Sequence, residues 1–190
     1  MKAEGLLFSY RTVPRDLGAY AVEDVRKFLE KIQKKFPILQ GAEVLHRPEG
    51  VKGYVFVDLR PAFESIPEDK AVEITSSLIS AIKEAFDRGE LMSIARVRII
   101  HKIANTDIES ISKVTKEIFA DKIKGKWKIE IHTRKIIDRI ETIKAVGSHI
   151  DKPVDLKNPE YVLHIEVLGR KMTLLYLVYK PKEDDVIIRI

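Results

Sequence analysis

The chain has 190 residues, of which 45% are apolar, so it is long enough for two small domains and too apolar to be disordered. It has no cysteine, which excludes disulfides, thiolate zinc sites and cysteine nucleophiles. The net charge is +5, and the sequence has neither a signal-like start nor a run near eighteen apolar residues. We therefore expect a cytoplasmic protein with no membrane partner.

The basic excess lies in the middle of the chain. Residues 1–95, 96–150 and 151–190 carry net charges of −1, +6 and 0, from 14 against 15, 13 against 7 and 7 against 7 basic and acidic side chains. Abundant Lys, Glu and Ile are typical of a heat-adapted surface, which is the simplest explanation for any single lysine. A surface charged only for solubility would mix both signs, so the segregation favours a polyanion such as nucleic acid as partner.

Residues 1–104 are predicted to form a ferredoxin-like domain, because their hydrophobic periodicity gives the element order βαββαβ. A capping box of Ser65 and Glu68 starts the second helix, and Gly89 ends it. The expected elements are strand 6–11, a helix with its apolar stripe over 22–36, strands 42–47 and 54–59, helix 65–89 and strand 94–103. The buried stripe of the second helix is predicted to be Val72, Leu78, Ile79, Ile82 and Phe86.

Residues 105–190 are predicted to form a second α/β domain after a short joint at 104–106. Thr106 and Glu109 make another capping box before a helix over 108–119. A strand, a helix over about 134–148 and strands 161–168 and 172–179 should follow. The inward side chains of the 134–148 helix are predicted to be Ile136, Ile137, Ile140, Ile143 and Val146.

The segment 121–134 has the most informative pattern in the chain, because basic and apolar residues alternate along it. A period of two is typical of a strand, with one face for the core and one cationic face for a polyanion. Trp127 falls on the apolar face, which favours core packing over base stacking. Since a helix start is predicted directly after the strand, its unpaired N–H groups would favour a phosphate at that corner.

Other local signatures of chemistry are missing from the sequence. The five histidines never pair at helical metal-site spacing, and neither a G-x-x-x-x-G-K loop nor a G-x-S-x-G elbow occurs. The run from Asn158 to Tyr161 resembles the Asn-Pro-Pro-Tyr element of amino-group methyltransferases, but Glu160 replaces the second proline. Asp155 and Asn158 are interpreted as turn residues that bond nearby backbone. We therefore expect no catalytic residue, no metal and no cofactor.

Two sequence stretches resemble a THUMP domain. They are the run Trp127 to Arg134 and, after the helix ending near Gly147, the element Val-Asp-Leu-Lys-Asn-Pro-Glu at 154–160 before a strand. The preceding segment is similar to the ferredoxin-like domain that accompanies THUMP domains. The resemblance thus covers nearly the whole chain and implies a ferredoxin-like domain at 1–104 and a THUMP domain at 105–190.

The resemblance implies a tRNA-binding module that grips the acceptor stem and the single-stranded CCA end. THUMP enzymes that thiolate, deaminate, methylate or isomerise tRNA bases carry a further catalytic domain, and this chain stops at Ile190. We therefore expect a non-catalytic adaptor, similar to the THUMP protein that presents tRNA to a cytidine acetyltransferase for 4-acetylcytidine formation. Two alternatives remain open. One is a subunit of a split thiolase, methyltransferase or deaminase that supplies active-site residues in trans, and the other is a ribosome-associated or general RNA-binding protein with no role in modification.

Arg134 and Lys135 are the leading candidates for phosphate contacts, by the resemblance and by their place at the strand-to-helix corner. Lys126, Lys128, Arg139 and Lys144 are the next candidates, and each of them, taken alone, is equally well explained as solvated surface charge. The predicted RNA-binding residues are Lys126, Lys128, Arg134, Lys135, Arg139, Lys144 and Asn158.

Overall fold

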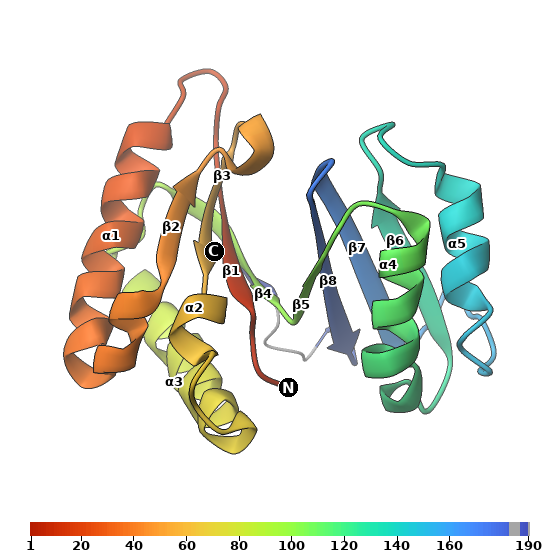
Figure 1. Ribbon diagram of the computed structural model, residues 1–190. Coiled ribbons are helices and arrows are strands. Elements are labelled where there is room, and N and C mark those ends of the chain that lie inside the picture. Colours follow the sequence, from red (N-terminus) through yellow and green to blue (C-terminus); the bar gives the residue numbers. More distant parts are fainter. Residues whose placement is uncertain (183–186, 190) are drawn as a thin grey trace. The chain divides into compact units, whose positions relative to one another are not determined.

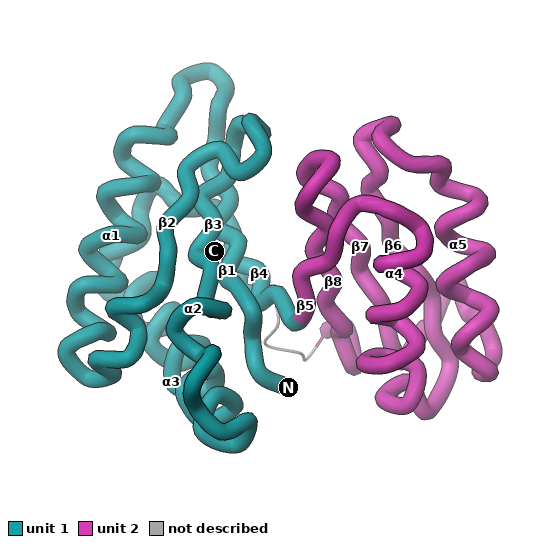
Figure 2. The backbone as a smooth tube through the Cα atoms, in the orientation of Figure 1, with its two compact units in different colours: residues 1–101, 187–190 teal, residues 102–186 magenta. Residues whose placement is uncertain are grey.

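The computed structural model describes residues 1–182 and 187–189, and its backbone divides into two compact units (Figure 2). Unit 1 comprises Met1–His101 and Ile187–Ile190, and unit 2 comprises Lys102–Val186. The sequence predicts a division between residues 104 and 105. The backbone contacts place it after His101 and return the end of the chain to unit 1, where no element was predicted.

Unit 1 is a ferredoxin-like domain, as the sequence predicted. Its antiparallel sheet has the order β2-β3-β1-β4-β9 (Figure 1). The first four strands, with α1 and α3, reproduce the βαββαβ order. The elements are β1 Gly5–Tyr10, α1 Gly18–Lys35, β2 Glu43–His46, β3 Tyr54–Asp58, α2 Arg60–Phe63, α3 Glu68–Asp87, β4 Ile94–Ile100 and β9 Ile187–Arg189, with 3-10 turns at Pro37–Gly41 and Pro48–Gly50.

The first helix of unit 1 packs as its sequence pattern predicts. Phe8 of β1 and Phe28 of α1 are both buried, with ring centroids 6.3 Å apart. Full burial of one such side chain stabilises a fold by about 1.5–3 kcal/mol. The buried residues of α1 are Gly18, Ala21, Val25, Phe28, Leu29 and Ile32, which form one stripe that faces the sheet.

The predicted start and stripe of α3 were partly wrong. The helix begins at Glu68 after Pro67, and the Ser65 side chain does not cap it. Its buried stripe is Ala71, Ile74, Thr75, Leu78, Ile82 and Ala85, so only two predicted members belong to it. Thr75 is tolerated inside because its hydroxyl donates to the Ala71 carbonyl and accepts the Ala3 N–H.

Unit 2 is built on a four-stranded sheet of order β5-β8-β7-β6, in which β6 runs parallel to β7 and the other pairs are antiparallel. Its elements are β5 Lys102–Ala104, α4 Ile108–Val114, β6 Trp127–His132, α5 Arg139–Gly147, β7 Tyr161–Gly169 and β8 Met172–Tyr179. A π-turn at Thr115–Phe119 and a 3-10 turn at Ala120–Lys122 extend α4. Apolar residues of α4, α5 and the sheet together form its core.

The strand predicted over 94–103 is two strands in different sheets. β4 ends at Ile100 in unit 1, β5 starts at Lys102 in unit 2, and His101 lies between them. An apolar run looks the same in sequence whether it stays in one sheet or passes into another, so periodicity could not show this break.

The alternating segment forms a shorter strand than predicted. Only Trp127–His132 is a strand. Ile123 is buried too, but it follows the 3-10 turn that ends at Lys122 and is not part of the strand. Trp127 is 2% exposed, and its indole N–H donates to the Lys152 carbonyl at 2.9 Å, which confirms the prediction that it packs in the core. The outward face of this strand carries Lys128, Glu130 and His132, so it holds a single lysine, and the strand does not reach back to Asp121.

The helix after this strand also starts later than predicted. α5 begins at Arg139, so a turn separates it from β6. Ile136 and Ile140 are 37% and 62% exposed rather than inward-facing, and Thr142 is buried in their place. Thr142 is satisfied because its hydroxyl donates to the Asp138 carbonyl at 2.6 Å. The buried face of this helix was predicted from its isoleucines and valine. A threonine whose hydroxyl is hydrogen-bonded to the backbone can also be buried, and the apolar pattern does not show it.

Candidate nucleic-acid interface

The lysines at the beginning of β6 are paired with carboxylates. Lys126 Nζ lies 3.5 Å from Asp155 Oδ2, and Lys128 Nζ lies 2.6 Å from Glu130 Oε1. Burial opposes ionisation of Glu130, but the Lys128 hydrogen bond and the nearby histidines outweigh it and lower the pKa of Glu130. Ion pairs this close to solvent are weak, so a phosphate could still displace the carboxylates.

Asp155 organises the loop before β7. Its carboxylate accepts the backbone N–H groups of Asn158 and Lys157 at 2.9 and 3.0 Å. These two hydrogen bonds, with Lys126 nearby, lower the pKa of Asp155. The interpretation of Asp155 as a turn residue is confirmed, while the Asn158 side chain is exposed at the loop surface.

Arg134 and Lys135 form a strained turn at the end of β6. Their φ angles are +50° and +58°, and the Ile136 N–H donates to the Thr133 carbonyl across the turn. Positive φ at both central residues is the pattern of a type I′ turn, which normally takes Gly or Asn. Each such non-glycine residue costs about 1–2 kcal/mol, so the surrounding structure must hold the turn in place.

The Arg134 side chain is engaged inside unit 2. Its Nη2 donates to Glu166 Oε1 at 2.7 Å, and the Glu166 side chain is only 9% exposed. A buried carboxylate needs such a partner, because an unpaired buried charge is strongly destabilising. The structure therefore places Arg134 as the partner of Glu166, on the strand next to β6.

A pocket of about 390 Å³ lies beside this turn and is lined by Thr106, Lys135, Ile136 and Arg170. The Thr106 hydroxyl donates to the Gly169 carbonyl and lies 2.8 Å from Thr173 Oγ1. Thr106 therefore ties the start of α4 to the β7–β8 turn instead of capping the helix. That role belongs to Asp107, whose side chain accepts the Ser110 N–H, so the predicted capping box was wrong.

Arg170 is the basic residue of this pocket that the sequence analysis missed. It lies 35 positions after Lys135 along the chain, in the short turn between β7 and β8. The parallel β6–β7 pair brings both residues to the same end of the sheet, because both follow the carboxyl ends of their strands. The signal in the sequence that could have pointed to Arg170 is a basic residue in the turn between two strands.

The predicted anion site at the amino end of α5 was wrong. Asp138 caps that end, and its side chain accepts the Glu141 N–H at 2.8 Å. The cap places a carboxylate where a phosphate would need a positive terminus. Arg139 and Lys144 of α5 are both exposed.

The sheet thus separates the predicted site residues into two groups. Lys126 and Asn158 lie at the end where β6 and β7 begin, and Arg134 and Lys135 lie where β6 ends. The six residues of β6 span about 20 Å. A ligand that contacts both groups has to be as long as a stretch of nucleic acid.

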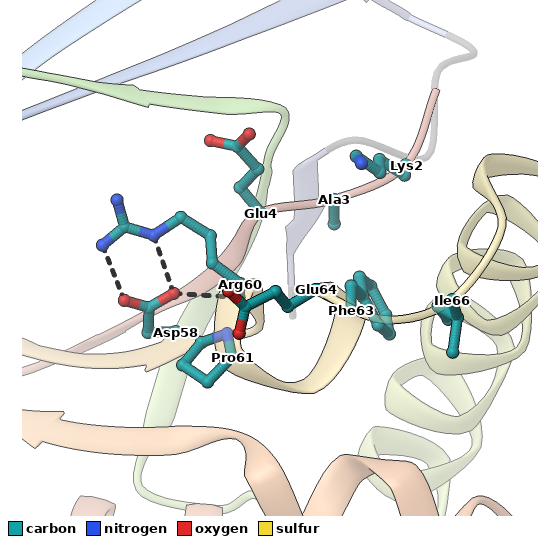
Figure 3. Close-up of a pocket in the computed structure, with 9 residues that line it drawn as sticks. All are labelled: Lys2, Ala3, Glu4, Asp58, Arg60, Pro61, Phe63, Glu64 and Ile66. Atoms are coloured by element: carbon teal, nitrogen blue, oxygen red, sulfur yellow. Dashed lines mark hydrogen bonds and ion pairs between the residues drawn. The ribbon is translucent and has the colours of Figure 1, made fainter.

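A further pocket, of about 580 Å³, lies in unit 1 (Figure 3). Arg60 makes a two-point ion pair with Asp58 on its wall, and this hydrogen bonding raises the pKa of Arg60. Glu4 and Glu64 also line it. The lining carries three carboxylates against the two cations Lys2 and Arg60, and this net negative charge opposes a polyanion, so we do not assign the pocket to nucleic acid.

Residues 105–177 match the model of the THUMP domain family. The chain therefore contains a THUMP domain, a class of RNA-binding module, and combines it with a ferredoxin-like domain. A comparison with curated proteins gives no match.

Three solved structures share this fold. The crystal structure of PH1313 from Pyrococcus horikoshii Ot3 has a TM-score of 0.59 at 14% identity and covers 94% of this chain and 55% of its own. A 4-thiouridine synthetase in complex with RNA and ATP has a TM-score of 0.51 at 14% identity, covering 94% and 42%. TrmN from Thermus thermophilus has a TM-score of 0.50 at 16% identity, covering 92% and 45%. This chain spans about half the length of these proteins, and the likeness is one of fold.

Neither a metal site nor a membrane span is found in the described part of the chain. Over residues 1–182 and 187–189, no three His, Asp or Glu side chains converge as a metal site would require. In the same part of the chain, no helix is long and apolar enough to cross a membrane.

Proposed function

We propose that this protein is a tRNA-binding adaptor that holds the acceptor stem and CCA end of tRNA and presents them to a separate modification enzyme. The observation that carries the proposal is the THUMP domain at residues 105–177, together with its basic surface. The likeness to a 4-thiouridine synthetase solved with RNA supports an RNA partner. The proposed partner enzyme is the tRNA cytidine acetyltransferase that makes 4-acetylcytidine.

The geometry supports recognition of shape more than of base sequence. The basic residues lie on turns, on the edge strand β6 and on helix α5, where they can contact backbone phosphates, and the buried Trp127 offers no face for base stacking. The acceptor stem would be contacted by Asn158, beside Lys126 at the end where β6 and β7 begin, and by the charges of Lys126, Lys128, Lys135, Arg139 and Lys144. We expect the protein to act on tRNA in the cytoplasm.

A gel-shift titration tests RNA binding. Purified full-length protein is titrated against one intact tRNA, the same tRNA without its CCA end, and a duplex RNA of equal length. Preference for intact tRNA that is lost on trimming supports acceptor-end capture. Equal binding to all three would reduce the protein to a general RNA binder, and no binding at all would refute the proposal.

The alternative is a subunit that completes the active site of a split enzyme. It is favoured by one observation: the tRNA-related proteins of similar fold are about twice as long as this chain. Reconstitution with the acetyltransferase separates the two functions. Variants that lose tRNA binding and activity together support the adaptor, whereas a variant that keeps tRNA binding but abolishes activity supports the split enzyme.

A further inference from the structure

We propose that the pocket lined by Thr106, Lys135, Ile136 and Arg170 binds one phosphate group of the RNA, and that Arg134 and Glu166 position Lys135 for it. The proposal rests on the proposed function for the identity of the RNA. It assigns different tasks to two adjacent basic residues. Lys135 contacts the phosphate, and Arg134 is a positioning residue that holds the turn.

The lining of the pocket suits a phosphate. Lys135 and Arg170 provide two positive charges from separate segments, and no carboxylate is among the described residues that line it. Arg matches phosphate oxygens with paired N–H donors, and Lys adds a mobile point charge. Ile136 gives the pocket an apolar side against which a ribose can pack.

Two features hold the backbone of the turn that carries Arg170. The Thr106 hydroxyl donates to the carbonyl of the preceding Gly169, and the β7–β8 register shifts between Val167 and Gly169. An irregularity of this kind at a strand end redirects the side chains that follow. Both features act on the backbone of the turn that carries Arg170, and this residue lines the pocket.

Lys135 is held by the residue before it. Both residues have positive φ, a conformation that persists in non-glycine residues only where neighbouring interactions enforce it. The 2.7 Å bond from Arg134 to the buried Glu166 is such an interaction. Backbone strain of this kind is concentrated at ligand sites, which is the second reason to assign the pocket a ligand.

The first test compares two variants with the same loss of charge. Lys135→Gln with Arg170→Gln empties the pocket of cations, and Lys122→Gln with Lys124→Gln is the control before the start of β6. We expect the pocket variant to bind tRNA on the order of tenfold more weakly or worse, with a salt dependence shallower by about one phosphate contact, because the pocket holds one phosphate. The control should change affinity less than about threefold. Equal losses in both variants would overturn the pocket.

The source of the phosphate is tested with tRNA that has or lacks its 5′-phosphate. If removal weakens binding to the wild type but not to the pocket variant, the pocket holds the terminal phosphate. If removal changes neither, while the pocket variant remains weak, the pocket holds a backbone phosphate. Loss of the same size in wild type and variant would place the terminal phosphate elsewhere, and the pocket would then hold a backbone phosphate if the pocket variant is itself weak. If that variant binds as tightly as the wild type, the proposal is overturned.

The positioning role is tested with Glu166→Gln. This change removes a negative charge near the pocket, so simple electrostatics predicts tighter tRNA binding. The proposal predicts weaker binding, because Arg134 loses its anchor and the turn relaxes. In the Lys135→Gln background, Glu166→Gln should cause no further loss. Tighter binding, or an equal loss in both backgrounds, would overturn the role of Arg134 and Glu166.

Failure of the pocket and failure of the proposed function give different results. If wild type and pocket variant bind tRNA equally well, the pocket is wrong and RNA binding stands. If no tRNA binds, inorganic phosphate titrated into the wild type still tests the pocket, through amide chemical shifts of Lys135, Ile136 and Arg170. Shifts confined to these residues would support it, and their absence would overturn it.

Discussion

The two ends of the THUMP sheet both carry basic side chains, but they differ in how those charges are used. At the end where β6 begins, Lys126 Nζ lies 3.5 Å from Asp155 Oδ2, and the Glu160 carboxylate accepts the backbone N–H of Lys126. At the other end, Lys135 and Arg170 line a pocket whose described walls hold no carboxylate. The net charge of a segment is therefore a poor guide to where an anion binds, because paired cations and available cations count equally in it.

The largest expected effect comes from Trp127, which anchors the end of the sheet where β6 begins. Trp127→Ala should destabilise unit 2 by about 3–5 kcal/mol, because it leaves a cavity and removes the hydrogen bond to Lys152. Urea unfolding followed by circular dichroism measures the loss. Trp127→Phe keeps most of the ring and should cost much less. Equal costs for both changes would show that packing of the ring is not what anchors this end.

A comparison of the two ends in tRNA binding should give a smaller effect. Lys126→Gln with Lys128→Gln removes two paired cations, so we expect a weaker loss of affinity than for the pocket variant. The slope of affinity against salt, measured from about 50 to 200 mM, gives the number of phosphates that each variant still neutralises. A larger loss of affinity at the end where β6 begins would reverse the difference between the two ends.

The pH dependence of stability should report on Asp155. Its pKa is lowered in the folded protein, so its contribution is complete above the ordinary value of 3.8 and is lost as the pH falls through the lower folded-state value. The wild type should therefore lose more stability than Asp155→Asn between pH 7 and about pH 3. Urea midpoints at the two pH values measure this. If the wild type and the variant lose the same stability between the two pH values, Asp155 does not cause the pH dependence.

The smallest expected effect is that of Asn158→Ala. The side chain is exposed, and the turn uses only its backbone N–H, so stability should change by less than about 0.5 kcal/mol. Any loss of tRNA affinity in this variant would then report a direct contact. Thermal unfolding and a gel shift of the same preparation provide both readings, and a large stability loss would show that the amide supports the loop.

The order of elements could be predicted from sequence because it depends on hydrophobic period, which unit 1 shows clearly from β1 to α3. The break at His101 could not, since an apolar run does not record which sheet it joins. Helix starts failed where an adjacent residue offered a better acceptor, as Asp107 did beside Thr106. Helix starts are therefore hardest to predict where several polar residues that can cap a helix follow one another.

For the candidate site, the sequence could indicate which residues are basic but not which are already paired. Arg134 and Lys135 are neighbours with the same charge, yet one bonds a buried carboxylate contributed by β7 and the other lines a pocket. That distinction depends on Glu166 and Arg170, which reach the turn through the parallel pairing of β6 and β7. Long-range pairing of this kind leaves no trace in local spacing.

The edge strand β9 belongs to unit 1, although its residues follow all of unit 2 in the chain. During synthesis, the sheet of unit 2 can therefore close before that of unit 1 is complete. In that interval β4 is an open edge, and it carries Arg96 and Arg98, charges of the kind that discourage strands of other chains from pairing. The domain that starts first on the ribosome is thus the one that finishes last.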